Sequence, residues 1–104
     1  MDFDKAVVLA TAWVDILCEG GARIVRESTI AKPYGWRFFY QSKEFLDVGN
    51  PSAQLVGNAP IIVNRNTREL RLFGTAKPLE QYLTEYENTL PPGSLQQTPQ
   101  LPTW

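Results

Sequence analysis

The sequence contains no histidine and only one cysteine, Cys18. A zinc site built from cysteine and histidine is therefore excluded, because such a site needs several of these ligands. The absence of histidine also excludes every mechanism that uses this residue as a general base. A lone cysteine cannot form an internal disulfide, so we expect a protein of a reducing compartment.

The sequence also lacks an excess of charge of either sign. Ten basic and eleven acidic side chains leave a formal net charge of -1, whereas nucleic-acid binders normally show a basic surplus. The apolar stretch near the N-terminus follows Asp2 and Asp4 and is interrupted by Asp15. It has neither the positive charge of a signal peptide nor the length of a membrane span. We therefore expect a cytoplasmic protein that binds neither nucleic acid nor a membrane.

No catalytic constellation is visible among the carboxylates and Cys18. Most carboxylates lie on predicted helix faces or in turns, whereas two-acid hydrolysis requires a pair fixed across a cleft. The loops contain asparagine and glycine but almost no aspartate, so a hard-metal site is not predicted. Cys18 follows a predicted helix, and the dipole at that end disfavours a thiolate. We expect a protein without catalytic residues, cofactor or metal.

Hydrophobic periodicity predicts two helices and four strands. Apolar spacings of three and four predict a helix over Phe3–Leu17, capped by Asp2, and a second helix that has Pro78 in its first turn and Thr75 as its cap. Alternating and β-branched stretches predict strands at 22–30, 36–42, 60–64 and 69–73. Residues 91–104 hold four of the eight prolines and no charge. We predict one domain over residues 1–90 and an extended proline-rich tail over 91–104, with local polyproline character at most.

The short connections between the strands favour an antiparallel meander. The fold predicted is α+β, with a four-stranded antiparallel sheet that carries both helices on one face. The other face is predicted to present alternate side chains of two strands: Arg37, Phe39, Gln41, Glu69, Arg71 and Phe73. Aromatic and arginine side chains among charges are typical of a protein-binding surface. An ordinary solvated sheet face with a few aromatics explains the same pattern.

Several blocks of the sequence together resemble a known family. They are the strand with Trp36, Phe38 and Tyr40, the EFL block at Glu44–Leu46, Gly49, LVGNAPIIV at Leu55–Val63 and LFGTAKPLEQYLTEYE at Leu72–Glu87. This pattern resembles the immunity protein 35 family, also called YrhB-like, from Phe3 to Glu87. The GNAP and GTAKPLEQYL blocks are its most specific part, and the proline-rich tail lies outside it.

The resemblance implies a small bacterial α+β protein that binds and neutralises the toxin domain of a polymorphic toxin system by direct contact, without catalysis. The matching residues are of structural types and indicate the fold rather than a toxin-binding surface: Gly57, Asn58, Pro60, Gly74, Thr75, Pro78, Tyr82 and Tyr86.

Two alternatives to the immunity function stay open. One is a chaperone-like binder of partly folded chains, for which the exposed aromatics and the uncharged tail supply an apolar patch. The other is a small-ligand or enzyme module around Asn50, Asn58 and the aromatic hairpin. Neither the identity of the toxin nor the oligomeric state follows from the sequence.

Overall fold

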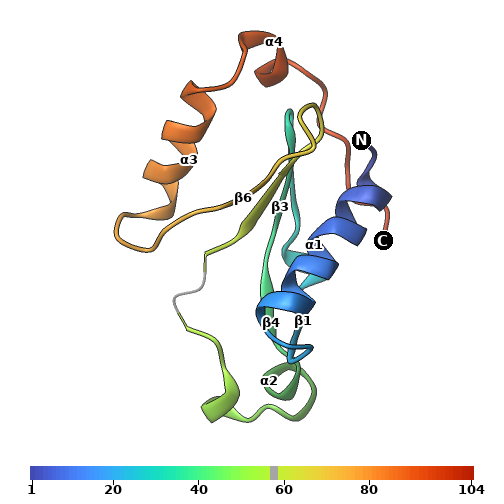
Figure 1. Cartoon of the computed structure of the whole chain (residues 1–104), viewed down its shortest axis with the longest axis vertical. Helices are drawn as coiled ribbons and strands as arrows, with labels where there is room; N and C mark the ends of the chain where they lie inside the picture. Colours follow the sequence, from blue (N-terminus) through green and yellow to red (C-terminus); the bar gives the residue numbers. More distant parts are fainter. Residues whose placement is uncertain (57–58) are drawn as a thin grey trace.

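The structure is a computed structural model that describes residues 1–56 and 59–104; Gly57 and Asn58 of the GNAP block lie outside the described residues. Its elements are, in chain order, α1 (Phe3–Leu17), β1 (Ala22–Ile24), η1 (Arg26–Ser28), β2 (Ile30–Lys32), β3 (Gly35–Phe38), β4 (Tyr40–Ser42), α2 (Lys43–Val48), η2 (Pro51–Ala53), β5 (Ile61–Asn64), β6 (Leu70–Leu72), α3 (Leu79–Asn88) and α4 (Pro92–Leu95). Helices combined with antiparallel strands confirm the predicted α+β class (Figure 1).

The strands form two antiparallel sheets in the described part of the chain, rather than one. The larger sheet has four strands in the order β2-β3-β5-β6, which confirms the predicted meander, and the smaller pairs β1 with β4. The predicted strand at 22–30 is divided by η1, and the strand at 36–42 is divided at Phe39. The three residues of η1 lengthen only one side of the hairpin. The pairing therefore cannot continue in a single register, and a second ladder begins.

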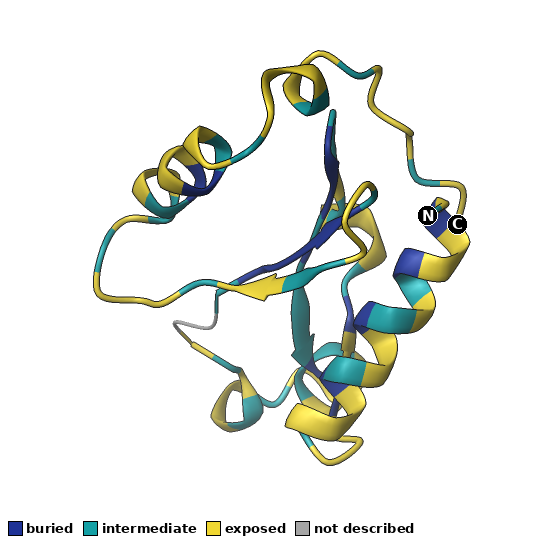
Figure 2. Cartoon of the chain, turned by 45° about the horizontal axis from the view of Figure 1, so that its top comes forward, coloured by how far each residue is buried: buried dark blue, intermediate teal, exposed yellow. Residues whose placement is uncertain are grey.

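The two long helices cover opposite faces of the larger sheet, so the prediction that both cover one face is wrong (Figures 1 and 2). α1 packs on Ile61 and Val63 of β5, whereas α3 packs through Leu83 and Tyr86 on Ile62 of the same strand. Every residue of β5 is buried. An uninterrupted apolar run of this kind is typical of a strand that is covered on both faces.

The larger of the two apolar cores lies between α1 and the sheet. The buried side chains of α1 recur at spacings of three and four: Phe3, Ala6, Ala10 and Val14. Because two of these are alanines, the helix lies close to β3, where Trp36 and Phe38 are completely buried. Asp2 caps the helix as predicted, since its side chain accepts a hydrogen bond from the Lys5 backbone N–H at 3.0 Å.

The tail crosses the molecule from α4 to the N-terminal end of α1, where the two termini lie side by side (Figure 1). Arg65 Nη1 donates a hydrogen bond to the Thr98 carbonyl at 2.8 Å. Trp36 Nε1 donates to the Gln100 carbonyl at 2.7 Å. These bonds hold the proline-rich segment against the side of the molecule that α1 covers.

Candidate partner-binding site

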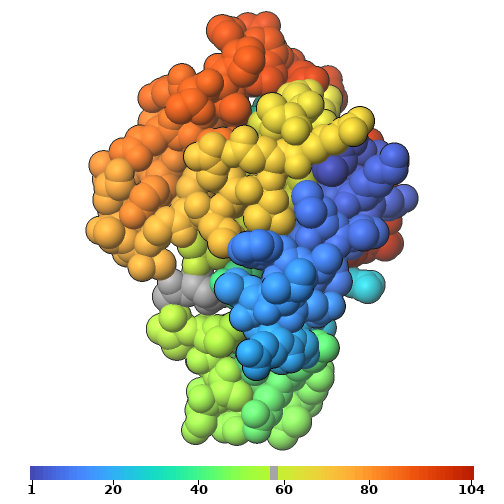
Figure 3. Space-filling model, viewed as in Figure 1, coloured from blue at the N-terminus to red at the C-terminus, as the bar shows by residue number. Residues whose placement is uncertain are grey.

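Most of the residues predicted for a partner-binding face lie on the side of the sheet that α3 covers. β6 is an edge strand of the larger sheet as described, and the loop after it returns the chain so that α3 lies alongside β6 (Figures 1 and 3). Between β6 and α3 lies a depression of about 290 Å³, which we call the β6–α3 groove. It is lined by Arg71, Phe73, Tyr82, Glu85, Tyr86 and Thr89.

A buried asparagine connects the two walls of the groove. Asn64, the last residue of β5, is 1% exposed. Its Oδ1 accepts hydrogen bonds from the backbone N–H groups of Asn66 at 2.8 Å and Thr67 at 3.1 Å, which fixes the reversal into β6. Its Nδ2 donates to Tyr86 Oη at 3.1 Å. One side chain thereby joins the β5–β6 turn to α3.

Aromatic rings form the floor of the groove. Phe73 stacks on Tyr82 with ring centroids 5.9 Å apart and an interplanar angle of 12°, and it meets Tyr86 edge-on at 5.9 Å. The Arg71 guanidinium lies 5.3 Å from the centroid of Tyr86, and the Lys77 ammonium lies 4.8 Å from that of Tyr82. These contacts restrict the rings to one orientation.

Ion pairs surround the aromatic floor. Lys77 Nζ lies 2.8 Å from Glu85 Oε1, and Arg71 Nε donates to Glu69 Oε1 at 2.6 Å. The hydrogen bond that Lys77 donates to the Glu85 carboxylate raises the pKa of Lys77, and burial raises the pKa of Tyr86. Lys77 is therefore charged and Tyr86 is neutral at pH 7. Exposed ion pairs of this kind contribute little to stability because solvent screens them.

Arg37 lies on the same face as the groove but beneath α3. Its side chain is 12% exposed, its Nη1 lies 3.7 Å from Glu80 Oε1, and its guanidinium lies 5.6 Å from the centroid of Phe39. Its buried Nε has no hydrogen-bond partner among the described residues. Phe39 lines a separate depression of about 250 Å³ together with Gly74 and Leu79. Arg37 therefore supports α3 and is not an exposed anchor.

Gln41 lies outside the groove, on β4 of the smaller sheet. Its Oε1 accepts hydrogen bonds from the backbone N–H groups of Leu55 at 2.7 Å and Ser42 at 2.8 Å, and its Nε2 donates to the Leu55 carbonyl at 3.2 Å. Its amide thus holds the segment after η2 to the smaller sheet. The prediction assumed one uninterrupted strand over 36–42, and the break at Phe39 separates Gln41 from the other five residues.

Comparison with known proteins shows to which family this fold belongs. The model of the family described as immunity protein 35 matches residues 4–88. The chain belongs to the immunity protein 35 family. It is also similar to the uncharacterized protein YrhB of Escherichia coli (strain K12), with 49% identity over 53 residues, which are 51% of this chain and 56% of YrhB. The aligned part thus spans little more than half of that relative. The search of solved structures found no match.

In this immunity protein 35 member, the GTAKPLEQYL block builds one wall of the groove. A Cβ on Gly74 would lie 2.8 Å from Tyr82 Oη, so the chain passes close to this tyrosine. Tyr82 Oη accepts a hydrogen bond from the Ala76 backbone N–H at 3.2 Å, and Pro78 occupies the N-cap position of α3. Tyr82 and Tyr86, which the sequence indicates as core residues, also line the groove. Their four-residue spacing was the available indication that they share a surface.

Of the two asparagines named for the small-ligand alternative, the structure describes Asn50. No group of three histidine, cysteine or acidic side chains in residues 1–56 and 59–104 is arranged to hold a metal ion. Asn50 uses its side chain within the chain, because Oδ1 accepts from the Ser52 backbone N–H at 3.1 Å and Nδ2 donates to Glu44 Oε1 at 2.9 Å. Asn58 lies outside the described residues.

The helices that the structure describes are too short or too polar to cross a membrane.

Proposed function

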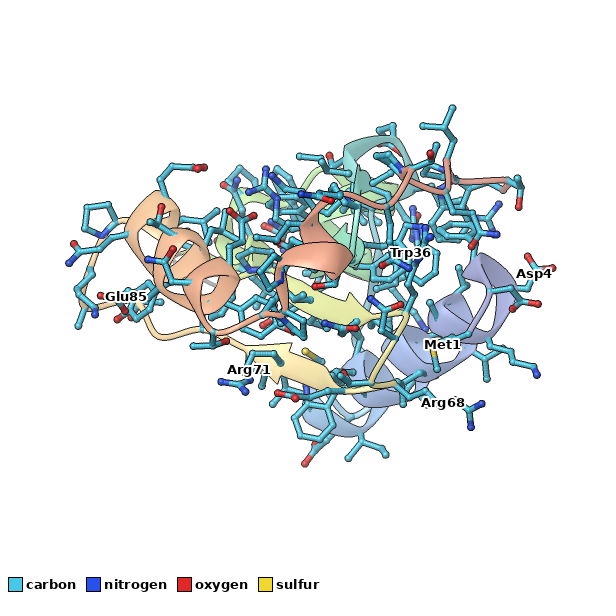
Figure 4. All side chains as sticks on the ribbon, turned by 90° about the horizontal axis from the view of Figure 1, so that it is seen from above. Met1, Asp4, Trp36, Arg68, Arg71 and Glu85 are labelled. Carbon is cyan, nitrogen blue, oxygen red and sulfur yellow. The ribbon has the colours of Figure 1, made fainter. Side chains whose placement is uncertain are left out.

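We propose that this immunity protein 35 family member binds a cognate bacterial toxin domain in the cytoplasm and neutralises it by direct contact at the β6–α3 groove. The observation that supports this is the cluster of the exposed Arg71 with the partly exposed rings of Phe73 and Tyr82, which line one groove. Arg71 projects from the outside of the molecule (Figure 4). Arginine and aromatic side chains dominate the binding energy of protein interfaces. The proposed mechanism is occlusion of the active cleft of the toxin, which requires no catalysis.

The charge of α3 favours a basic partner surface. The helix carries Glu80, Glu85 and Glu87 and no basic residue, and the Glu85 side chain is 53% exposed. Charges of opposite sign steer association and raise its rate constant. We expect the toxin surface that covers the groove to be basic and the association rate to fall as the salt concentration rises.

The proposal is tested by co-expressing the chain with the toxin domain encoded beside its gene. Arg71→Ala should reduce protection of the cells and raise the Kd of the purified complex about 10–100-fold, the loss expected for an interface hot spot. Arg68→Ala is the matched control, because Arg68 also projects from the outside of the molecule (Figure 4). Protection that survives Arg71→Ala, or that falls equally with Arg68→Ala, would contradict the assignment of the groove.

Titration of toxin activity separates binding from catalysis. A protein that occludes its target should inhibit the toxin completely at one molar equivalent. Below one equivalent, the fraction of toxin inhibited should equal the fraction of toxin that is bound. Complete inhibition by a small fraction of an equivalent would instead show turnover, and the non-enzymatic proposal would fail.

For the chaperone-like alternative, one apolar element of the tail is engaged within the chain. The ring centroid of Trp104 lies 5.1 Å from that of Phe3 and 6.3 Å from that of Phe38, so the tail is in contact with its own core. Suppression of client aggregation by an excess of this chain would restore the alternative, and its absence would remove it.

A further inference from the structure

The tail has the sequence spacing of a proline-rich recognition peptide. Pro99 and Pro102 stand in the PxxP spacing, with Trp104 two residues further on. Such segments adopt polyproline II, which has no internal hydrogen bonds, and dock on aromatic surfaces. Residues 98–104 form neither helix nor strand. Within the part of the chain that the structure describes, no backbone–backbone hydrogen bond joins residues 97–104 to the rest.

The surface beneath the tail is formed by aromatic rings of α1 and β3. Trp36 lies inside the molecule between α1 and the tail (Figure 4), and its Nε1 donates to the carbonyl of Gln100, which stands between the two prolines. The rings of Phe3 and Phe38 meet Trp104 edge-on, with interplanar angles of 86° and 76°. The indole N–H thus fixes one carbonyl of the segment while flanking rings hold its aromatic end.

A cation completes this surface. The Arg26 guanidinium lies 5.2 Å from the centroid of Trp104, whose residue is 44% exposed. We call the set of Phe3, Arg26, Trp36 and Phe38 the Trp36 site. Because side chains hold the tail and no ladder of backbone bonds does, the tail can leave this site without disrupting a helix or a strand.

We propose that the Trp36 site binds proline-rich peptides of the form PxxPxW, and that residues 97–104 are its intramolecular ligand. The family match ends at residue 88, so the tail is an addition to the part of the chain that defines the family. α1 and α3 cover opposite faces of the sheet, so the Trp36 site is separate from the β6–α3 groove. The proposal therefore does not depend on toxin binding.

The tethered tail competes strongly with any free peptide. A short flexible connection gives a tethered ligand an effective concentration of about 1 mM. A free peptide with an intrinsic Kd of about 10–100 µM should consequently bind the intact chain about 10–100-fold more weakly than a chain whose tail is loosened. This difference is the quantity that an experiment can measure.

The experiment measures binding of a fluorescein-labelled peptide with the sequence of residues 96–104 to the full chain by anisotropy. Trp104→Ala loosens the tail but keeps the Trp36 site, and should bind the peptide at least about tenfold more tightly than wild type. Leu101→Ala is the matched control in the same tail, because that residue is 71% exposed, and it should behave like wild type. Adding Arg26→Ala to the Trp104→Ala chain should weaken its binding of the peptide severalfold.

Two results would overturn the proposal. One is equal binding of the peptide to the wild-type and Trp104→Ala chains, and the other is undiminished binding of a peptide in which both prolines are alanine. If the Trp104→Ala chain does not unfold cooperatively, Pro102→Ala is used in its place, since this change removes no aromatic ring. In either loosened chain the Trp36 indole N–H should lose protection from hydrogen exchange and regain it when peptide is added. A Trp36 indole N–H whose exchange rate does not change when peptide is added would contradict the proposal.

Discussion

Replacing Asn64 by alanine should break the connection between the β5–β6 turn and α3. The change removes two hydrogen bonds accepted from Asn66 and Thr67 and one donated to Tyr86 Oη. At about 1 kcal/mol for each bond, the loss of stability is about 3 kcal/mol. Water can reach the exposed residues Asn66 and Thr67, which lowers the expected loss toward about 2 kcal/mol. This is a large share of the roughly 5–15 kcal/mol that stabilises a typical domain.

Urea unfolding followed by circular dichroism measures this loss. With an m value of about 1–2 kcal/mol per molar, the midpoint should fall by about 1–2 M. Tyr86→Phe removes one of the bonds and should cost about 1 kcal/mol, and the double variant should lose about 1 kcal/mol less than the two single losses combined. Additive losses, or a loss below about 0.5 kcal/mol for Asn64→Ala, would refute the connection described here.

Two further predictions concern stability. Gly35→Ala should destabilise the fold by more than about 3 kcal/mol, because its Cβ would lie 1.9 Å from the Val63 carbonyl oxygen. A Cβ on Gly93 would have nothing within 4 Å, so Gly93→Ala should change the stability little. Equal losses of stability for the two variants in urea unfolding would contradict the close packing at Gly35. Burial, and then the 2.8 Å hydrogen bond to Glu87, raises the pKa of Tyr34 above its usual 10.0. The contribution of the neutral Tyr34 side chain to the free energy of unfolding is therefore complete below pH 10. It is lost as the pH rises above 10 toward the pKa of the folded state, by about 1.4 kcal/mol per pH unit. Tyr34→Phe should flatten this alkaline decline, and an unchanged slope would exclude Tyr34 as its source.

The class and the order of the main elements were predictable because hydrophobic periodicity is a local property. The spacing in α1 and the strand at β5 depend on neighbouring residues alone. The side of the sheet on which α3 lies is not local, because it depends on how much apolar surface each face must bury. The run Ile61–Val63 already indicated a strand covered on both sides, and the predicted single-sided arrangement left Ile62 without a partner.

The candidate site was predictable in part. Arg71 and Phe73 share a face, as strand alternation requires, and they line one groove. Gln41 was misplaced because η1 shifts the register of the hairpin, and an insertion of this kind has little sequence signature. The tyrosines of α3 were missed as site residues because their helix was assigned to the opposite face. Whether this surface binds a partner stays a prediction.

The arrangement of the tail was beyond sequence reasoning. The absence of charge and the four prolines predict an extended segment over 91–104. Residues 98–104 form neither helix nor strand, but the prediction is wrong at Pro92–Leu95, which form the short helix α4 because a proline is tolerated in the first turn of a helix. The contacts of Trp104 with Phe3 and Phe38 join residues from the two ends of the chain. No periodicity in the sequence indicates such a pairing, because it arises only when the termini meet at the end of α1.

The most direct test of the central claim is the Kd of the complex with the cognate toxin domain, measured by titration calorimetry for wild type, Arg71→Ala and Arg68→Ala. If the β6–α3 groove is the interface, Arg71→Ala should weaken binding at least about tenfold while Arg68→Ala stays within about twofold of wild type. Wild-type affinity in Arg71→Ala, with the fold intact by circular dichroism, would place the interface elsewhere and contradict the account.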